Sequence, residues 1–419
     1  MIEANSRAFW RATLALCLGS FLVFANLYIT HPLMPLFRTE FGLSELEASW
    51  SLSLPMLTLG LSLLVFGPLS DAIGRRKIMV LTLTGAIIAG GLVGQAENYQ
   101  QLLLLRAVQG FMLGGLPAVA IAYLGDEFNP RAMLLAVGFY ISGNSLGGVS
   151  GRLLGGLITD LSGWQFAFEA IAIGSLVGLT LFIWLLPPSQ HFIAKPLKVS
   201  HMRQDLSGHL RNPLLLGAYL IGGLNFFVFS NQFSFVTYLL SDAPYNLPPA
   251  LLGLLFLTYL SGTFGSAISG RIAQHLPQAL CMLLGILILI VGSLVTLIDS
   301  INAIICGLLI NSFGFFFSHS MASAWVNRYA ERARASASSL YLVFYYLGAA
   351  SGGFYMAPFW DHGQWPGVVM GSLLILTVTA AIASWLYRKE RHCKELSRKE
   401  QPRKEQQGVN QAVSEHAIR

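Results

Sequence analysis

The sequence has few charged residues for its length. Of its 419 residues, only 11% are charged and 54% are hydrophobic, whereas about 25% of an average soluble domain is charged. Too few polar side chains remain to cover a soluble surface, and the apolar composition excludes a disordered chain. The four cysteines provide neither a disulfide framework nor the spacing of a metal site. These absences leave a protein that crosses a membrane several times.

Long apolar runs are abundant instead. A transmembrane helix needs about 20 mainly apolar residues, and twelve continuous runs of this kind favour helices over the alternating strands of a barrel. We therefore predict an all-α membrane protein with twelve transmembrane helices in two six-helix bundles. The expected spans are 11–36, 46–69, 78–96, 101–124, 132–158, 165–187, 213–240, 248–270, 279–298, 302–327, 335–358 and 366–387.

The basic residues are unevenly distributed between the connecting segments. With the N-terminus inside, 23 of the 26 Lys and Arg residues fall in cytoplasmic segments, as the positive-inside rule requires. Only Arg38 lies in an outer segment, while Arg106 and Arg152 fall within spans. We therefore predict that both termini are cytoplasmic. No basic face with interleaved aromatic residues indicates nucleic-acid binding.

The longest polar connection divides the chain into two halves. The predicted organisation is a cytoplasmic N-terminus (1–10), an N-terminal six-helix bundle (11–187), a cytoplasmic central loop (188–212), a C-terminal six-helix bundle (213–387) and a charged cytoplasmic tail (388–419). At an offset of 203 residues, the segment 270–274 echoes part of 67–77, and Arg334 corresponds to Arg131. Two such bundles, related by duplication, are the plan of a secondary transporter with its substrate path between the halves.

Three motifs make the chain similar to a known family. The loop 67–77 reads Gly-Pro-Leu-Ser-Asp-Ala-Ile-Gly-Arg-Arg-Lys, the fourth span contains Arg106, Gln109 and Gly110, and the fifth span contains the series Gly138, Gly147, Gly151, Gly155 and Gly156. With these motifs, residues 10–387 resemble the major facilitator superfamily, and particularly its drug:proton antiporters and bacterial inner-membrane transport proteins of the YnfM type. The chain departs from the antiporter motif at Arg152, where a proline is usual.

The resemblance implies a multi-pass transporter of the bacterial inner membrane. It would export small organic molecules such as drugs or sugars by alternating access, in exchange for protons. The proton gradient would supply the energy, so we expect no cofactor, no metal and no catalytic residue. The expected partners are a small-molecule substrate, protons and the lipid bilayer, and we expect a monomer. Proton symport that imports a solute is the alternative mechanism, and a receptor or scaffold is a further alternative.

The loop motif is interpreted as a gating element formed by Gly67, Asp71, Gly74, Arg75 and Arg76. The two glycines are expected to permit tight turns. A carboxylate at this position can approach the positive N-terminal end of a helix, so we expect Asp71 to bind the start of the eleventh span near Ser336 and to hold the outward-open state.

The cationic part of the motif has its own expected partner. We expect Arg75 to pair with Asp126 or Glu127 at the end of the fourth span. The alternative is that the charges of this loop only set the orientation of the chain in the membrane.

The charges inside the spans are the sharpest candidates for function. A cation at mid-bilayer depth costs about 2.5–3.5 kcal/mol on insertion scales, so Arg106 and Arg152 need partners. Counted along their helices, Arg106, Arg152 and Glu169 share one layer. We therefore predict a coupling cluster of these three with Gln109, in which Glu169 is protonatable. The alternative is that each side chain snorkels to the interface.

Two further sets of residues have both a functional and a structural interpretation. Glycines spaced along the fifth span permit close helix packing, which can also seal the bundle against ion leakage. In the superfamily the first, fourth, seventh and tenth helices line the cavity, which here offers His319 as a second coupling candidate or as an ordinary hydrogen-bonded histidine. The polar residues that these helices offer are Asn26, Tyr28, His31, Arg106, Gln109, Asn225, Asn231, Gln232, Asn311, Ser318 and His319. The substrate-cavity candidates among them are Asn26, Tyr28, Asn225, Asn231, Asn311 and His319.

Overall fold

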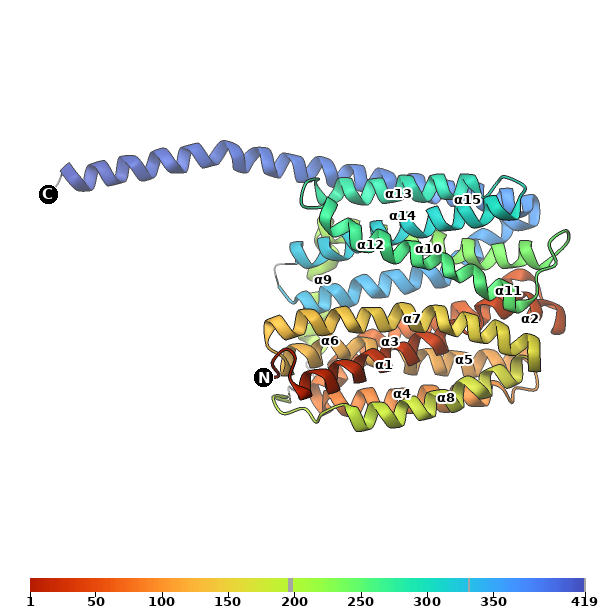
Figure 1. Ribbon diagram of the computed structural model, residues 1–419. Helices are drawn as coiled ribbons and strands as arrows, with labels where there is room; N and C mark the ends of the chain where they lie inside the picture. The colour runs from red at the N-terminus through yellow and green to blue at the C-terminus, as the bar shows by residue number, and fades with distance from the viewer. Residues whose placement is uncertain (195–198, 331, 418–419) are drawn as a thin grey trace.

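The computed structural model describes residues 1–194, 199–330 and 332–417, and places their helices in two bundles (Figure 1). Within these residues the only β pairing is a single bridge between Ile2 and Phe128. The predicted all-α fold is confirmed. Lys195, Lys198 and Arg419, three of the basic residues used to orient the chain, lie outside the described residues.

The helices follow the predicted spans within a few residues. The first bundle contains α1 (Arg7–Tyr28), η1 (His31–Leu33), α2 (Met34–Glu40), α3 (Glu45–Ile73), α4 (Arg75–Val93), α5 (Tyr99–Leu113), α6 (Gly115–Glu127), α7 (Pro130–Ser162) and α8 (Trp164–Leu185). The second contains α10 (Pro213–Ser241), α11 (Pro249–Leu254), η2 (Leu255–Thr258), α12 (Tyr259–Ile272), α13 (Gln278–Val295), α14 (Ile301–Tyr329) and α15 (Arg334–Ala417).

The helix α15 contains the last two predicted spans. Gln364 interrupts it with non-helical dihedral angles (φ 49°, ψ −140°). Length and hydropathy therefore delimit 11 candidate spans in the described residues, the last of them a single segment of 57 residues, Ser336–His392. Divided at Gln364, that segment provides two crossings, which reconciles the count with the twelve expected spans.

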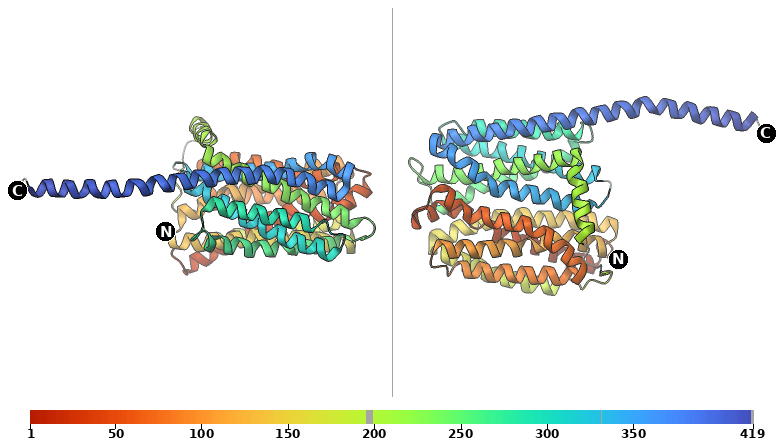
Figure 2. Two further views of the ribbon diagram at one scale, coloured as in Figure 1. Left: turned by 90° about the horizontal axis from the view of Figure 1, so that it is seen from above. Right: turned by 180° about the vertical axis from the view of Figure 1, so that it is seen from behind.

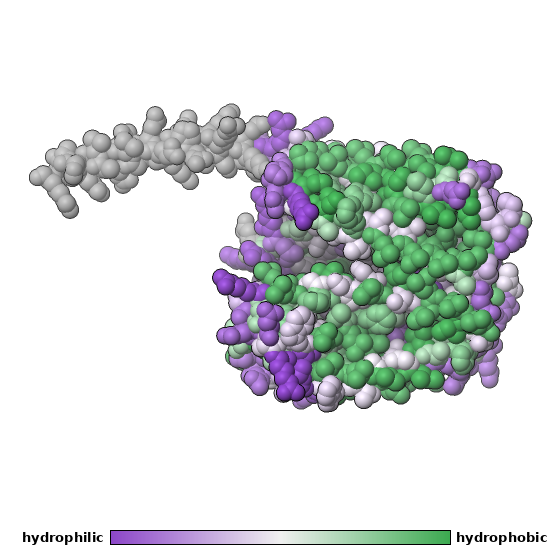
Figure 3. All heavy atoms as spheres, viewed as in Figure 1, coloured by the Kyte–Doolittle hydropathy of each residue, from purple (hydrophilic) through white to green (hydrophobic). Residues whose placement is uncertain are grey.

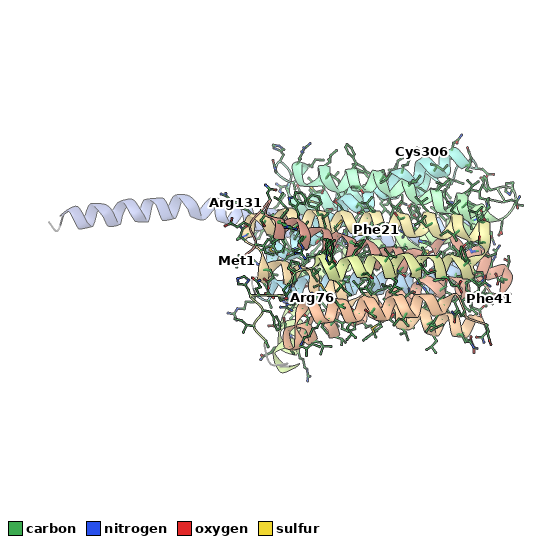
Figure 4. The ribbon with its side chains drawn as sticks, turned by 60° about the horizontal axis from the view of Figure 1, so that its bottom comes forward. Met1, Phe21, Phe41, Arg76, Arg131 and Cys306 are labelled. Carbon is green, nitrogen blue, oxygen red and sulfur yellow. The ribbon has the colours of Figure 1, made fainter. Side chains whose placement is uncertain are left out.

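The basic residues gather at one end of the molecule. Met1, Arg76 and Arg131 lie at this end, which we call the basic end, whereas Phe41 lies at the opposite end, which we call the Arg38 end (Figure 4). Figure 3 shows an apolar belt between two polar ends, as expected of a protein that spans a bilayer. The clustering of cations at one end is the asymmetry on which the orientation rule depends.

A helix that the sequence did not predict lies within the central loop. The helix α9 (Val199–Arg211) runs across the basic end, transverse to the spans (Figure 2). It contacts α10 and α15 of the second bundle. The segment predicted as a loop therefore includes a transverse helix beneath the bundles.

Local signals in the sequence set several helix boundaries. Ser44 and Glu47 form a reciprocal capping box that begins α3. Gly74 separates α3 from α4 with φ of 113°, a conformation that favours glycine. The expectation that Gly67 also forms a turn is wrong, because this residue lies inside α3, where its neighbours continue the helix.

Candidate functional site

An ion pair joins the two bundles at the Arg38 end. The Arg38 guanidinium contacts Glu45 Oε1 at 3.0 Å within its own bundle, and it contacts both carboxylate oxygens of Asp242 in the other bundle, at 3.0 and 2.5 Å. Beside it, the Tyr238 hydroxyl donates to the Glu45 carbonyl at 3.0 Å across the same boundary. These contacts close the Arg38 end.

This ion pair was not predicted from the sequence, although the sequence contains a signal for it. Arg38 and Asp242 are 204 residues apart, close to the repeat offset of 203. Opposite charges therefore occupy nearly equivalent positions in the two halves. A search for complementary charges at the repeat offset would have found them.

Replacing Asp242 by asparagine is expected to favour opening of the Arg38 end. The loss of a half-exposed ion pair is worth about 1 kcal/mol, which corresponds to roughly a five-fold change in the ratio of open to closed molecules. Pulsed electron paramagnetic resonance would measure this ratio with spin labels at the exposed positions 97 and 361, on a background free of native cysteines. Asp299→Asn, an equal charge change at the same end, is the control. Equal distance distributions in wild type and Asp242→Asn would contradict the prediction.

A second inter-bundle contact is formed by helices. The carbonyl oxygen of Pro249 on α11 lies only 2.3 Å from where a Cβ on Gly156 of α7 would be placed. Similarly, a Cβ on Gly253 would lie 2.8 Å from the Arg152 carbonyl oxygen. Asp160 Oδ2 also accepts a hydrogen bond from the Ala250 N–H at 3.3 Å. Glycine at these positions therefore allows α7 and α11 to cross at backbone contact.

Arg152 lies behind this crossing, in a buried polar chain that joins the bundles. Its Nε donates to His31 Nδ1 at 3.2 Å, and His31 Nε2 lies 3.2 Å from Ser234 Oγ on α10. Ser234 in turn donates to the Ser230 carbonyl at 3.1 Å. All three linked side chains are almost inaccessible to solvent. The residue that replaces the usual proline therefore provides a contact between the bundles.

Aromatic rings complete the surroundings of Arg152. Its Cζ lies 3.7 Å from the ring centre of Tyr28, 4.5 Å from that of Phe256 and 4.8 Å from that of Tyr259. Such rings stabilise a desolvated cation by about 2 kcal/mol or more each in favourable geometry. Among the contacts of the described residues, none joins Arg152 or His31 to a carboxylate. The Gly148 carbonyl oxygen accepts from Arg152 Nη1 at 2.8 Å. The buried charge is therefore held by rings, this carbonyl and His31.

Arg106 has different surroundings and is fully buried. Its Nη1 and Nη2 donate to the Asn26 and Leu27 carbonyls at 2.9 and 2.7 Å, at the end of α1. Its Nε donates to the Ser51 carbonyl at 3.1 Å, and Pro55 deprives this same carbonyl of its helical donor. Arg106 thus satisfies the orphan carbonyls of two interrupted helices.

The predicted cluster of Arg106, Arg152 and Glu169 is not formed. Arg106 and Arg152 have separate partners, and no ion pair in the described part of the chain includes Glu169. Glu169 packs beside Gly94 at the end of α4. Helix depth placed the three residues in one layer, but it did not give the direction of their side chains. Proton transfer by Glu169 remains a prediction.

Gln109 does join Arg106, and a neutral counterpart exists in the second bundle. Gln109 Oε1 accepts from Arg106 at 2.6 Å, and its Nε2 donates to Asn26 Oδ1 at 3.2 Å. In the second bundle, Asn311 donates to Gln232 Oε1 at 2.6 Å and to Ser293 Oγ at 3.1 Å. Gln109 and Asn311 are 202 residues apart, which supports the internal duplication.

The four asparagines proposed for the cavity form links between helices, and their role in substrate binding stays a prediction. Asn26, Asn225, Asn231 and Asn311 are all buried. Asn225 donates to Ser318 at 3.1 Å, and Asn231 donates to the Phe227 and Ala349 carbonyls at 2.8 and 3.0 Å. Their amides therefore join helices within the bundles, although the buried side-chain oxygens of Asn225 and Asn311 accept no hydrogen bond from the described residues.

His319 is partly exposed and lies among aromatic rings. It is half-buried, its Nδ1 lies 2.8 Å from the Tyr341 hydroxyl, and its ring stacks on Phe315 with 5.9 Å between ring centres. The ring centre of Tyr345 lies 4.8 Å from the ring centre of His319. This aromatic group offers a partly accessible surface for an organic molecule.

The glycines of the fifth span form a seam with the first. A Cβ on Gly143, Gly147, Gly151 or Gly155 would lie 2.2–2.7 Å from a carbonyl oxygen of α1 or of its C-cap, Ile29. Gly138, by contrast, has nothing within 4 Å. The seam thus repeats every four residues, includes Gly143, which sequence analysis did not name, and excludes Gly138. Close packing explains these glycines.

The gating motif binds within its own bundle. Arg75 pairs with Asp71 at 2.5 Å and, as predicted, with Asp126 at 3.0 Å. Arg76 donates to the Ile183 and Leu186 carbonyls at the end of α8, at 3.0 and 3.3 Å. The expected contact of Asp71 with the region of Ser336 belongs to the other conformation and stays a prediction.

A model of the Major Facilitator Superfamily matches residues 16–353. The chain belongs to the Major Facilitator Superfamily. It is 37% identical over 385 residues to an uncharacterized MFS-type transporter, YybF, of Bacillus subtilis (strain 168), covering 92% of this chain and 94% of that one. It is also 37% identical over 393 residues to the inner membrane transport protein YnfM of Escherichia coli (strain K12), with 93% of each chain covered.

Solved structures of the superfamily share the fold at low sequence identity. A bacterial homolog of the human lysosomal transporter Spinster, in an inward-facing and unoccupied conformation, superposes with a TM-score of 0.74 at 17% identity, covering 92% of this chain and 99% of that one. The structure of a D-xylose–proton symporter superposes with a TM-score of 0.68 at 14% identity, covering 88% of this chain and 97% of that one. With its family match and its apolar helices, the chain is a multi-pass membrane transporter of this superfamily.

Proposed function

We propose that the chain exports small organic molecules from a bacterial cell in exchange for protons, with the basic end in the cytoplasm. The observation that carries this proposal is the asymmetric contact between the bundles. They are joined at the Arg38 end by an ion pair, a helix crossing and a buried polar chain. Toward the basic end, the molecule is hollowed between the bundles (Figure 3). Two bundles that touch at one end of a path are suited to alternating access.

The chemistry of the interior supports an organic substrate and a proton as coupling ion. The accessible surface near His319 is aromatic, which favours binding of apolar or aromatic groups. His31, a buried histidine at the boundary between the bundles, is a side chain of the type that shuttles protons in proteins. The inner-membrane relative of Escherichia coli supports the location, and the superfamily supports a monomer whose energy comes from the proton gradient, with no cofactor.

Proteoliposomes that contain a trapped pH dye test the direction of coupling. Ethidium, fluorescein and D-xylose, as an aromatic cation, an aromatic anion and a sugar, are added outside at equal pH. Antiport is expected to raise the luminal pH, because substrate entry releases protons. A fall in luminal pH would show symport, and the absence of any protein-dependent proton movement with all three compounds would contradict the proposal. Protein-free vesicles are the control.

A further inference from the structure

The hydrogen bonds of His31 define its protonation state in the closed conformation. A guanidinium Nε–H can only donate, so the His31 Nδ1 that lies 3.2 Å from it must carry a lone pair. The ring proton is then on Nε2, which can donate to Ser234 Oγ at 3.2 Å. The Ser234 hydroxyl donates its own hydrogen bond to the Ser230 carbonyl oxygen at 3.1 Å, so its oxygen accepts from His31. Each donor in this hydrogen-bonded series therefore has an acceptor only if His31 is neutral.

A second proton on His31 is incompatible with this arrangement. It would place an N–H on Nδ1 facing the Arg152 N–H, with two positive charges in contact inside the protein. The titratable groups that face His31 and Arg152 are Tyr28 from α1 and Tyr259 from α12, and neither can neutralise a second cation. Phe256 of η2 also packs on the His31 ring, with 4.4 Å between ring centres.

The position of His31 and Arg152 at the boundary between the bundles makes the protonation of His31 depend on whether the Arg38 end is open or closed. His31 belongs to the first bundle and Ser234 to the second, while the Arg152 backbone lies at the crossing of α7 with α11. Separation of the bundles at the Arg38 end would remove Ser234 and the α11 contacts, and would admit water to His31. Hydration lowers the cost of a charged imidazole. His31 therefore binds a proton more readily in the open state than in the closed state.

We propose that His31 takes up the coupling proton while the Arg38 end is open, and releases it when closure excludes water and brings Ser234 of the other bundle against it, beside Arg152. This inference rests on the proposed proton-coupled transport and names the group that performs the coupling. The closed state binds fewer protons, so it is favoured at high pH and lost as the pH falls. With an ordinary histidine pKa of about 6.5 in the open state, the ratio of open to closed molecules rises about ten-fold between pH 8 and 5.5.

The first test needs no substrate. Spin labels at positions 97 and 361 report the opening of the Arg38 end between pH 8 and 5.5, in lipid nanodiscs. We expect opening at low pH in wild type, and in His31→Gln a ratio that does not change with pH, because glutamine can accept from Arg152 without titrating. His362→Gln, which removes an exposed histidine at the same end, is expected to behave as wild type. Asp242→Asn is expected to keep the wild-type pH dependence of opening, which would show that the carboxylates at the Arg38 end are not its source.

Two further variants keep the test decisive if His31→Gln folds poorly. His31→Asn is a smaller non-titrating replacement with the same expectation. Arg152→Gln removes the cation that opposes protonation, so the closed and open states bind the proton more equally and the pH dependence shrinks. The inference is overturned if wild type shows no pH-dependent opening, or if the His31 variants open with the wild-type pH profile.

Coupling itself is measured with whichever compound moves protons in the proteoliposome assay. His31→Gln is expected to continue exchanging labelled for unlabelled substrate at equal pH, while accumulation driven by a pH gradient falls at least ten-fold. Retained accumulation would overturn the role of His31 while leaving the proposed transport intact. A wild-type protein that moves no substrate would instead overturn the proposed function, and the pH-dependent opening would still be measurable.

Discussion

Replacing Arg106 by lysine is expected to lower the thermal stability of the protein substantially. The guanidinium donates five hydrogen bonds, and an ammonium group has only three donors and no planar fork. Each buried acceptor left without a partner costs about 1–3 kcal/mol. We expect the melting temperature of the purified protein to fall by about 5–10 °C. Arg131→Lys, at an exposed position, is expected to leave it unchanged.

A substitution at Pro55 tests whether the stability lost in Arg106→Lys comes from the Ser51 carbonyl. In Pro55→Ala, the new N–H of residue 55 can donate to the Ser51 carbonyl, which otherwise accepts from Arg106 at 3.1 Å and from the Thr30 hydroxyl at 3.4 Å. The cost of Arg106→Lys should therefore be smaller by about 1 kcal/mol in the Pro55→Ala background, as measured by a double-mutant cycle. Equal costs in both backgrounds would mean that Arg106 does not act through the Ser51 carbonyl.

Alanine at Gly151 and alanine at Gly138 are expected to have opposite effects. The new Cβ at position 151 would lie 2.3 Å from the Ala25 carbonyl oxygen, and backbone atoms cannot give way without moving α1 from α7. Overpacking of this kind costs about 1–3 kcal/mol or more. At position 138 the space is open, and the higher helix propensity of alanine stabilises the helix by up to about 1 kcal/mol.

Folded yield and substrate-driven proton flux would measure the difference. Gly151→Ala is expected to lower both several-fold, whereas Gly138→Ala should retain wild-type values. Gly147 has the same surroundings as Gly151 and should respond in the same way. An equal loss at Gly138 would show that the glycine series acts through something other than packing against α1.

The sequence was sufficient for the fold because the fold follows from periodicity and composition. Apolar runs of span length, cations at one set of connections and a repeated offset are properties of segments. These properties were enough to predict the helices, their grouping into two bundles and the pairing of Arg75 with Asp126. The central loop was predicted without α9, because a short amphipathic helix carries no signal as strong as an apolar span.

The site was less predictable because side-chain direction depends on neighbouring helices. Arg106, Arg152 and Glu169 share a depth, yet the first turns toward α1 and α3 and the second toward His31. The proline at position 55 was a visible clue, since it frees a carbonyl that some donor must reach. The pairing of Arg38 with Asp242 was visible only as complementary charge at the repeat offset.

The partners of Arg106 also have a consequence for the biosynthesis of the protein. The carbonyls that bind this cation belong to residues 26, 27 and 51, all of which are synthesised before residue 106. Inserting an arginine into the bilayer without partners costs about 2.5–3.5 kcal/mol. Here the first and second spans, which provide the acceptor carbonyls, can be inserted in the membrane before Arg106 is. The fourth span is therefore expected to insert stably only after them, so the order of the helices along the chain is also a workable order of assembly.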